Sequence, residues 1–583
     1  MVIDNQGGKD MSYIDYETAS KDYARNLLFE LENKCSRNQA NVVITLLSYT
    51  FKHVNSLNNP RDVSFDQMVD YFKSSDPVIA SMLTEYLDER IWDKVKTYGI
   101  NYKDELLDYV ILHNHWYEVV SEYTESTPDS IVALSMKLLE DMTDKKVCDV
   151  CCGSGTFITE CYMNNNHGDY YAIDFNSNLY DILQIRNRVL GNHLNLTIGD
   201  IFVVDQLDNK FDYVFSNYPF SVTKTIIDKY IKDKNEVYPG LLNRSSDWIY
   251  NTKVLEMLNE KGKAIVIMTV GSVSNVADVK IKKFFIEKNY IETVITLPNK
   301  LFDFISIPTI LMVLNKGKEN RNITMVDASK VYQPERRKNT LSEENINSIL
   351  DAIKHESDIS TIVSDVDIIG NDYNLLPRRY IDKPITYENG VKFDSVIKSI
   401  TRGAPCKADE LDKISCKDET NNQFLMLANI NEGIVDDQLP YITQIDEKYE
   451  KYCIKDNSLV MSKMGAPIKM AVVKKDPDKK ILANGNLYVI ELDDTKINPY
   501  YLNAYFLSEE GKSALERIMA GSALPSIPLK ELKNLVIPLP SLEVQNKIAV
   551  KFLMNLDEIK ILKMKIERAK QSLKNIYLES EEG

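Results

Sequence analysis

The sequence predicts an α/β protein built around a mostly parallel, Rossmann-like sheet. Apolar residues show helical spacing near the N-terminus, β-branched runs then alternate with helical segments, and short strands with Gly and Pro turns follow. At 583 residues the chain exceeds the ~250–300 that one hydrophobic core supports. We therefore expect a helical N-terminal domain over 1–118, the sheet domain over 119–320, a helical connector over 321–384, a mixed α/β domain over 385–541 and a long coiled-coil-like helix over 542–583.

The strands expected in the sheet domain are short runs rich in β-branched and aromatic residues. They are Val147–Val150, Tyr170–Ile173, Leu196–Ile198, Tyr213–Phe215, Ala264–Met268 and Thr293–Thr296. Because helical segments separate these runs, the strands should lie mostly parallel, with helices on both faces. Ligands bind such sheets at the carboxyl ends of the strands, so the residues that follow each run are site candidates.

Composition excludes some classes of protein. The chain has no apolar run near the ~18–20 residues of a membrane span, and residues 1–12 lack the features of a secretory signal. We expect a cytoplasmic protein with reduced cysteines. Cys148, Cys151, Cys152 and Cys161 cluster, but no Cys or His pair with zinc-finger spacing follows them, so no metal site is expected.

The net charge of −16 argues against indiscriminate nucleic-acid binding, because affinity for a polyanion comes mainly from Lys and Arg. Any DNA contact must therefore be local. The most basic stretch carries Lys463, Lys469, Lys474 and Lys475. It has two interpretations: these lysines contact phosphates, or they belong to a solvated hairpin.

A turn rich in glycine follows the first expected strand. Asp149 ends that strand, and Gly153-Ser154-Gly155-Thr156 opens a helix. The glycines let backbone approach a ligand closely, and the helix N-terminus offers free N–H groups. The turn lacks the Gly-Lys-Ser/Thr of a Walker loop and the third glycine of a dinucleotide fingerprint.

Acidic residues follow the next two strands. Asp174 lies where a carboxylate is expected to accept from ribose hydroxyls. Asp200 could accept from the adenine amino group of a nucleoside cofactor, while Ile201 or Phe202 packs on its ring. Each Asp has an alternative interpretation as a helix cap or turn residue. The glycine-rich turn, Asp174 and Asp200 occur in this order along the chain, and together they favour a cofactor site.

The segment Asn217-Tyr218-Pro219-Phe220 follows the fourth strand, and here the chain resembles the amino-methyltransferases of DNA, whose loop is usually Asn-Pro-Pro-Phe or Asn-Pro-Pro-Tyr. The first Asn resembles the adenine-N6 branch more than the cytosine-N4 branch. The resemblance implies S-adenosyl-L-methionine as cofactor and adenine in DNA as substrate.

The chemistry explains the residue types of this loop. The adenine amino group is a poor nucleophile, and the Asn217 side-chain oxygen and the Tyr218 carbonyl can both accept its hydrogens as it attacks the methyl group. Phe220 would stack on the base, which must be flipped out of the duplex. Tyr218 stands where the family usually has Pro. The loop therefore loses some rigidity, and the bulky tyrosine ring must be accommodated.

Residues 120–320 resemble the modification subunit of type I restriction-modification systems, in the gamma order of motifs. Ser126-Thr127-Pro128-Asp129 is similar to that family's Thr-Pro motif, which closes over the methionine end of the cofactor. Further similar segments follow in the family's order: Ser246-Asp247-Trp248, Gly271-Ser272-Val273, Thr296-Leu297-Pro298 and Ile307-Pro308-Thr309.

The C-terminal third resembles one target-recognition domain of a type I specificity subunit. The segments that carry this resemblance are 457–463, 521–527 and 537–540. It implies double-stranded DNA as a partner, and a separate restriction subunit as a further one. The scaffold motifs do not indicate which bases are read.

The expected C-terminal helix carries a stripe with alternating gaps of four and three residues. Its members are Ile548, Phe552, Asn555, Ile559, Leu562, Ile566, Ala569, Leu573 and Ile576. Such a heptad seam with one Asn is typical of a coiled coil, which predicts a homodimer. The alternative is a helix packed on its own domain.

Together these observations predict a site-specific DNA adenine-N6 methyltransferase of a restriction-modification or related defence system. One alternative is an RNA or protein methyltransferase with a similar loop, which the C-terminal reader domain disfavours. The other is a DNA-binding scaffold with an inactive methyltransferase fold, which Tyr218 motivates.

Overall fold

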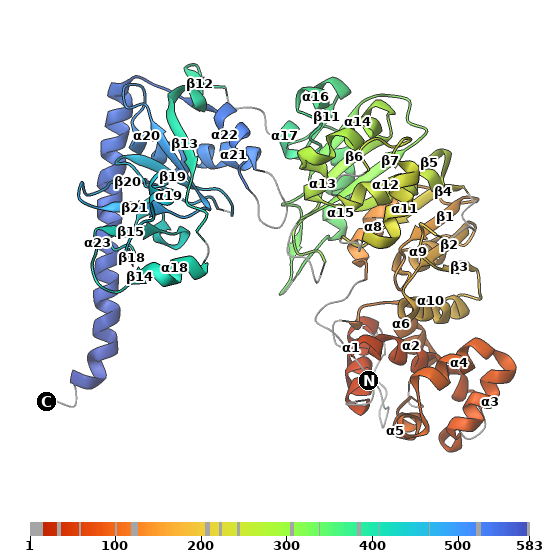
Figure 1. The fold of residues 1–583 in the computed structure, drawn as a ribbon. Helices are drawn as coiled ribbons and strands as arrows, with labels where there is room; N and C mark the ends of the chain where they lie inside the picture. The colour runs from red at the N-terminus through yellow and green to blue at the C-terminus, as the bar shows by residue number, and fades with distance from the viewer. Residues whose placement is uncertain are drawn as a thin grey trace. The chain divides into compact units, whose positions relative to one another are not determined.

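The computed structural model describes residues 15–31, 37–57, 60–99, 102–117, 126–203, 210–220, 224–241, 245–302, 308–336, 338–381, 386–406, 408–465, 467–519 and 526–579. The chain divides into two compact units, Met1–Ile381 and Asp382–Gly583 (Figure 1). Each unit is described by itself. Within the described residues, every helix is too short or too polar to cross a membrane.

The first unit begins with helices, as the sequence predicts. They are α1 (Tyr16–Glu30), α2 (Arg37–Val54), α3 (Phe65–Ser75), α4 (Pro77–Tyr86), α5 (Glu89–Gly99) and α6 (Asp104–Leu112). Asp76 caps α4 by accepting from the Ile79 N–H, and Pro77 fills its first turn.

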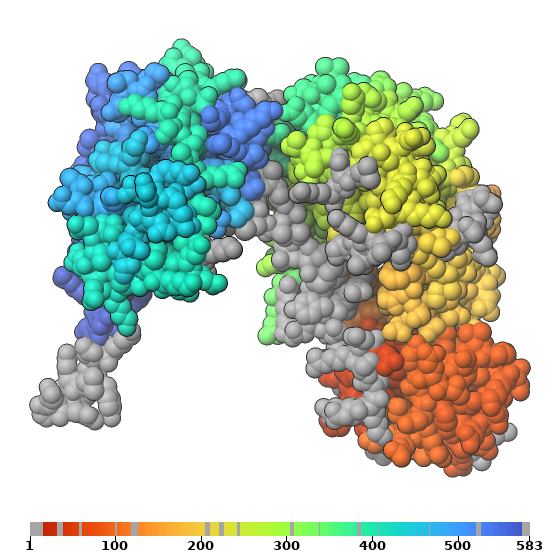
Figure 2. All heavy atoms as spheres, in the orientation of Figure 1, coloured from red at the N-terminus to blue at the C-terminus, as the bar shows by residue number. Residues whose placement is uncertain are grey.

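The core of these helices continues into the sheet domain. Ile182 and Ile185 of α10 (Ser177–Val189) are buried with the apolar side chains of the N-terminal helices. Arg188 of α10 forms an ion pair with Asp76, and the Tyr86 hydroxyl donates to the Asp181 carboxylate at 2.7 Å. The N-terminal helices therefore pack directly on the sheet domain, as the orange and gold surfaces show (Figure 2).

The sheet has nine strands in the order β11-β8-β6-β7-β5-β4-β1-β2-β3. Their bounds are β1 Lys146–Val150, β2 Asp169–Asp174, β3 Leu194–Ile198, β4 Phe211–Ser216, β5 Leu258–Thr269, β6 Ile291–Thr296, β7 Thr309–Asn315, β8 Ile323–Asp327 and β11 Ser360–Val363. Strands β3, β2, β1, β4 and β5 are parallel neighbours, whereas β7 runs antiparallel between β5 and β6. The predicted mostly parallel sheet and its six expected strands are confirmed.

Helices cover both faces of this sheet. Alternate residues of β5 face opposite sides: Val266 packs with α11 (Lys224–Lys234), α12 (Ser246–Met257) and α14 (Val279–Glu287). Ile265 packs with α8 (Asp129–Leu139), α9 (Thr156–Asn164) and α15 (Glu343–Lys354). This is the period-two alternation of a strand buried on both faces.

The helical connector expected over 321–384 is wrong in part. This stretch contains α15, α16 (Asp365–Gly370) and α17 (Arg378–Ile381), but it also supplies β8 and β11 to the sheet. Both strands are short, and exposed charged residues surround them in the sequence. The average character of the stretch therefore concealed two strands, β11 at the edge of the sheet and β8 beside it.

The second unit contains two four-stranded sheets. The first consists of β13 (Ile397–Arg402), β22 (Leu487–Leu492), β19 (Ser458–Ser462) and β20 (Met470–Val473), in that order. The second consists of β14 (Ser415–Cys416), β18 (Tyr441–Ile442), β15 (Asn422–Leu425) and β21 (Lys480–Ala483). The expected mixed α/β region is confirmed.

The long helix expected at the C-terminus is α23 (Leu542–Glu579). Its first turns are anchored by Gln545, which is fully buried, accepts from the Asn498 N–H at 2.8 Å and donates to the Pro540 carbonyl at 2.8 Å. Asn498 caps α20 (Pro499–Leu507), so the start of α23 is fixed against that helix.

Candidate functional site

The predicted site segments lie at one edge of the sheet. Since β3, β2, β1 and β4 are adjacent and parallel, the loops that follow these strands meet at their carboxyl ends, here called the carboxyl edge. The loops carry the Gly-Ser-Gly turn after β1, Asp174 at the end of β2, Asp200 after β3 and Asn217 after β4. Thus the fold brings together residues from four separate stretches of sequence.

The turn after β1 depends on its glycines. Gly153 and Gly155 have φ values of 57° and 77°, a left-handed conformation that glycine adopts at low cost. A Cβ atom at Gly155 would also lie 2.4 Å from Cδ1 of Leu183, and Gly155 directly precedes the first residue of α9. Backbone N–H groups at this helix start are therefore presented at the carboxyl edge.

Asp174 ties the β1 turn to the end of β2. Its two carboxylate oxygens accept from the N–H groups of Gly153 and Asn176, at 2.7 and 2.8 Å. Burial raises the pKa of Asp174, although these hydrogen bonds oppose the shift. A carboxylate oxygen has more than one acceptor position, so a bond to one N–H leaves capacity for a hydroxyl donor.

Asp149 lies under the turn. It is buried, and its burial together with the nearby Asp174 charge raises the pKa of the Asp149 carboxyl well above its usual range. A hydrogen bond from the Ile158 N–H of α9 opposes the shift. Asp149 is therefore a buried group that supports the turn through the start of α9.

The loop after β3 forms a local turn. The Asp200 carboxylate accepts from the Phe202 N–H at 2.8 Å, the geometry that the turn interpretation of Asp200 predicts. Ile201 is buried, and the Phe202 ring contacts Tyr230 and Tyr250 with centroid distances of 5.0 and 5.2 Å. Both apolar side chains are thus held close to the carboxyl edge.

Asn217 meets the Thr-Pro segment. Its Nδ2 donates to Oγ1 of Thr127 at 3.1 Å, although the two residues lie 90 positions apart. Because the amide is planar, turning Nδ2 toward Thr127 fixes the direction in which Oδ1 points. The preceding Ser216 donates to the Val150 carbonyl at 2.7 Å, which ties this loop to the end of β1.

The ring of Tyr218 is housed in the core. Its side chain is 1% exposed, stacks on Tyr250 with centroids 4.6 Å apart, and donates from its hydroxyl to Oδ1 of Asn251 at 3.0 Å. Burial raises the pKa of this hydroxyl well above its usual range, so it remains a donor. An anchored aromatic side chain thus stands where related loops have proline.

The two residues after Tyr218 are less buried than the Tyr218 ring. Pro219 is exposed, and Phe220 is half-buried with its ring edge-on to Phe302 at a centroid distance of 6.3 Å. Phe220 therefore presents part of its ring at the end of the loop that follows β4. The Tyr218 side chain points inward.

Sequence reasoning missed several residues of this edge. Tyr250 and Asn251 of α12, the partners of Tyr218, were not singled out, nor was Phe175, whose side chain is 65% exposed directly after Asp174. It also missed Asn114, which donates to Oγ1 of Thr156 at 2.5 Å, and the buried Arg186, which donates to the Ser154 carbonyl at 2.9 Å. An aromatic residue next to Asp174 was a usable signal, whereas the contacts of Asn114 depend on tertiary structure.

The four predicted DNA-binding lysines lie in two loops. Lys463 and Lys469 lie at the two ends of the loop between β19 and β20, and Lys469 Nζ donates to the Leu427 carbonyl at 3.0 Å. Lys474 and Lys475 instead follow β20 in a turn that leads to the other sheet. Lys475 Nζ donates to the Lys479 carbonyl at 2.7 Å, whereas Lys474 is exposed.

The cysteines at the β1 turn are buried or half-buried. Burial raises the pKa of each of these thiols well above its usual range. Among the residues that the structure describes, His, Cys, Asp and Glu form no group of three or more arranged to hold a metal ion.

Comparison with known proteins gives matches over both units. Residues 121–389 match the N-6 DNA Methylase family, and residues 407–571 match the Type I restriction modification DNA specificity domain. The chain is 32% identical over 287 residues to the type I restriction enzyme MjaVII methylase subunit of Methanocaldococcus jannaschii, covering 44% of this chain and 48% of that subunit. It is 31% identical over 138 residues to the MjaVIII specificity subunit of that organism, covering 22% of this chain and 32% of that subunit.

A solved structure supports the fold. The crystal structure of the type I restriction-modification system methyltransferase subunit from Streptococcus thermophilus aligns with a TM-score of 0.53 at 19% identity, covering 63% of this chain and 99% of that one. The chain spans about half the length of the methylase subunits that it matches in sequence. Residues 121–389 thus form an N-6 DNA methylase domain, which this chain joins to a type I restriction-modification specificity domain at residues 407–571.

Proposed function

We propose that this protein is a site-specific DNA methyltransferase that transfers a methyl group from S-adenosyl-L-methionine to N6 of adenine, within a restriction-modification or related defence system. The observation that carries the proposal is the contact between Asn217 and Thr127, at the edge where the Gly-Ser-Gly turn also opens. This contact orients the Asn217 amide, which supports a role for Asn217 beside a bound nucleoside cofactor. The two matched families support DNA as the substrate.

The residues present fit the cofactor. Asp174 has acceptor capacity for ribose hydroxyls, and the start of α9 offers N–H groups. Asp200 would accept from the adenine amino group, with Ile201, Phe202 and the exposed Phe175 as apolar surface for the ring. When bound, the cofactor supplies an electrophilic methyl group on its sulfonium.

The protein's own groups would act on the target adenine. The Asn217 Oδ1 and the Tyr218 carbonyl accept the two amino hydrogens, which directs the nitrogen lone pair toward the methyl carbon. With the cofactor bound, these two acceptors would hold the amino nitrogen in position to receive the methyl group, and the proton that the nitrogen gives up would pass to solvent. Phe220 would stack on the flipped base.

The test is direct. Duplex DNA of random sequence is incubated with the intact chain and S-adenosyl-L-methionine, and single-molecule sequencing then gives the modified base and the site together. N6-methyladenine at one recurring site is expected. Methylation confined to RNA or protein, or cofactor binding without transfer to any of the three, would support the two alternative functions instead.

We also propose that the chain pairs with a second copy through α23. The helix contacts its own domain as far as Lys563, which forms an ion pair with Glu432 at 2.6 Å, so the within-domain alternative describes its first half. From Leu562 onward the stripe is open: Leu562, Ile566 and Leu573 are 49%, 54% and 68% exposed. One recognition domain per chain would then give two per dimer, which predicts an inverted, two-part DNA site.

Light scattering tests the pairing. The intact chain should be dimeric, and joint replacement of Leu562 and Ile566 by Glu should give monomers, because charge cannot be buried in a helical seam. Lys565→Glu is the matched control, since it changes an exposed residue of the same turn. A monomeric wild-type chain on and off DNA would contradict the homodimer and favour a different subunit, such as a restriction subunit, as the partner of α23.

A further inference from the structure

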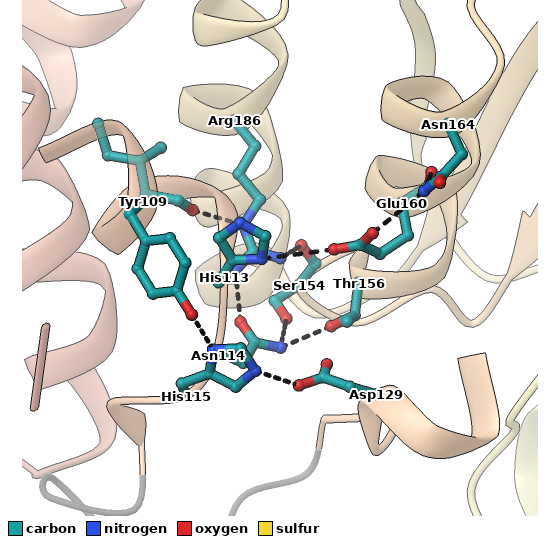
Figure 3. A network of polar contacts seen from close by, with 11 residues as sticks. Tyr109, His113, Asn114, His115, Asp129, Ser154, Thr156, Glu160, Asn164 and Arg186 are labelled. Carbon is teal, nitrogen blue, oxygen red and sulfur yellow. Dashed lines mark hydrogen bonds and ion pairs between the residues drawn. The ribbon is translucent and has the colours of Figure 1, made fainter. Parts of the chain in front are cut away.

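The residues that directly follow α6 contact two segments of the candidate cofactor site, the β1 turn and the start of α8. Asn114 and His115 are consecutive residues, and they belong to the stretch that joins the N-terminal helices to the sheet domain. Asn114 faces the β1 turn, whereas His115 faces the start of α8, directly after Thr127-Pro128 (Figure 3).

The hydrogen bonds of Asn114 fix the turn after β1. Nδ2 of Asn114 donates to Oγ1 of Thr156 at 2.5 Å and to Oγ of Ser154 at 3.3 Å. Its Oδ1 accepts from Arg186 of α10, a side chain that is fully buried. The guanidinium also donates to the carbonyls of Ile111 and Ser154, at 2.8 and 2.9 Å. One buried network therefore joins the end of α6, α10 and the Gly-Ser-Gly turn.

The contact of His115 with Asp129 fixes the Thr-Pro segment. Nε2 of His115 lies 2.7 Å from the carboxylate of Asp129, the first residue of α8. Tyr109 of α6 holds the other ring nitrogen, since its hydroxyl lies 2.5 Å from Nδ1. Asp129 is two residues after Thr127, whose hydroxyl accepts from Asn217. A short chain of contacts therefore leads from α6 to the catalytic amide.

We propose that Asn114 and His115 are positioning residues, with Asn114 setting the cofactor turn and His115 setting the Thr127 segment against Asn217. The helical domain would thus determine how the methyl donor and the adenine amino group are aligned. This inference deepens the proposed function and rests on it. Alignment of reacting groups to within a fraction of an ångström governs rate, so loss of either contact should be visible in function.

The groups around His115 predict a pH dependence. Glu17 and Lys21 of α1, Tyr109 of α6, Asp129 of α8 and the stacked ring of His113 face it. Burial alone would lower the pKa of His115, but Asp129 and then Glu17 outweigh this effect and raise it above its ordinary value. The imidazolium–carboxylate pair is therefore complete at low pH and is lost as pH rises through the folded-state pKa.

The experiment uses full-length variants. Asn114→Ala should weaken S-adenosyl-L-methionine binding by about tenfold in calorimetry, the scale of one lost hydrogen bond to a charged group or a buried network. Thr156→Val is the second variant, because it removes the contact with the turn while Asn114 still pairs with Arg186. It should weaken binding in the same direction.

His115→Ala should lower kcat by about tenfold while cofactor affinity stays within about twofold. His115→Gln is the conservative variant: its amide can still donate to Asp129, so it should recover most of kcat. The advantage of wild type over His115→Ala should shrink only in part as pH rises above the His115 pKa, because the neutral imidazole loses its charge but can still donate to Asp129. Backbone amides of residues 127–131 should exchange hydrogen faster in His115→Ala. His167→Ala, which removes an exposed imidazole from a loop before β2, is the control.

The outcomes are distinct. If the variants lose thermal stability but keep cofactor affinity, amide exchange and kcat, or if His115→Gln is as impaired as His115→Ala, the positioning roles are refuted. If the wild-type chain transfers no methyl group to DNA, the proposed function fails. The affinity of Asn114→Ala and Thr156→Val and the amide exchange of His115→Ala then still decide the inference.

Discussion

Polar side chains at the carboxyl edge of the sheet and the Lys475 side chain of the second unit are held in different ways. At the carboxyl edge, Asn217 is oriented by Thr127 and the β1 turn by Asp174, partners distant in the sequence. In the second unit, Lys475 donates to the carbonyls of its own turn. The comparison teaches that residue type alone does not identify a site. Orientation by distant elements is the more informative sign.

The largest effect is expected from removing the oriented amide. Asn217→Ala should abolish nearly all methyl transfer and leave cofactor affinity unchanged, because it deletes the proposed acceptor for the adenine amino group but no group assigned to the cofactor. Single-turnover kinetics measure it, with the exposed Asn166→Ala as control. Retention of more than about a tenth of kcat, under ~1.4 kcal/mol of barrier, would refute the role.

The next effect concerns the backbone of the β1 turn. Gly155→Ala should lower the free energy of unfolding by about 1–2 kcal/mol from the left-handed conformation alone, before the contact with Leu183 is counted. It should weaken cofactor binding as well, since the turn must shift. Gly370→Ala is the matched control, because its added Cβ meets no atom within 4 Å. Equal stability of the two variants in denaturant unfolding would contradict the argument.

Asp174→Ala should weaken S-adenosyl-L-methionine binding by about tenfold or more, the scale of a hydrogen bond to a charged group. The carboxylate also holds Gly153, so the β1 turn should loosen at the same time. Asp174→Asn separates the two effects, because its amide oxygen can still accept from Gly153. Calorimetry showing unchanged affinity for the Ala variant would refute the assignment to ribose.

The same comparison explains how much the sequence could predict. The β1, β2, β3 and β4 loops were predictable, because strand ends in a parallel sheet converge whatever the rest of the fold does. Strands β8 and β11 were not, because both are short and lie among charged residues. The inward direction of Tyr218 required α12, and the contacts of Asn114 required the packing of α6 on α10. Pairwise tertiary contacts leave no local pattern in the sequence.

The smallest effect tests the second unit. Lys474 is exposed and therefore able to approach a phosphate, whereas the ammonium of Lys475 is engaged by carbonyls of the turn over 474–479. We expect Lys474→Gln to weaken DNA binding and to reduce the slope of log affinity against log salt by about 0.9, the contribution of one phosphate contact. Lys475→Gln should leave that slope unchanged, because three carbonyls of the turn hold the Lys475 ammonium in place, and it should instead destabilise the turn. Fluorescence anisotropy over a salt series measures both variants, and circular dichroism confirms that each is folded.

If both variants reduce the slope equally, the turn opens on DNA, and the orientation seen here does not decide which lysines reach phosphate. If neither does, DNA contacts in this unit lie outside the turn, and the difference between the two regions is sharper still.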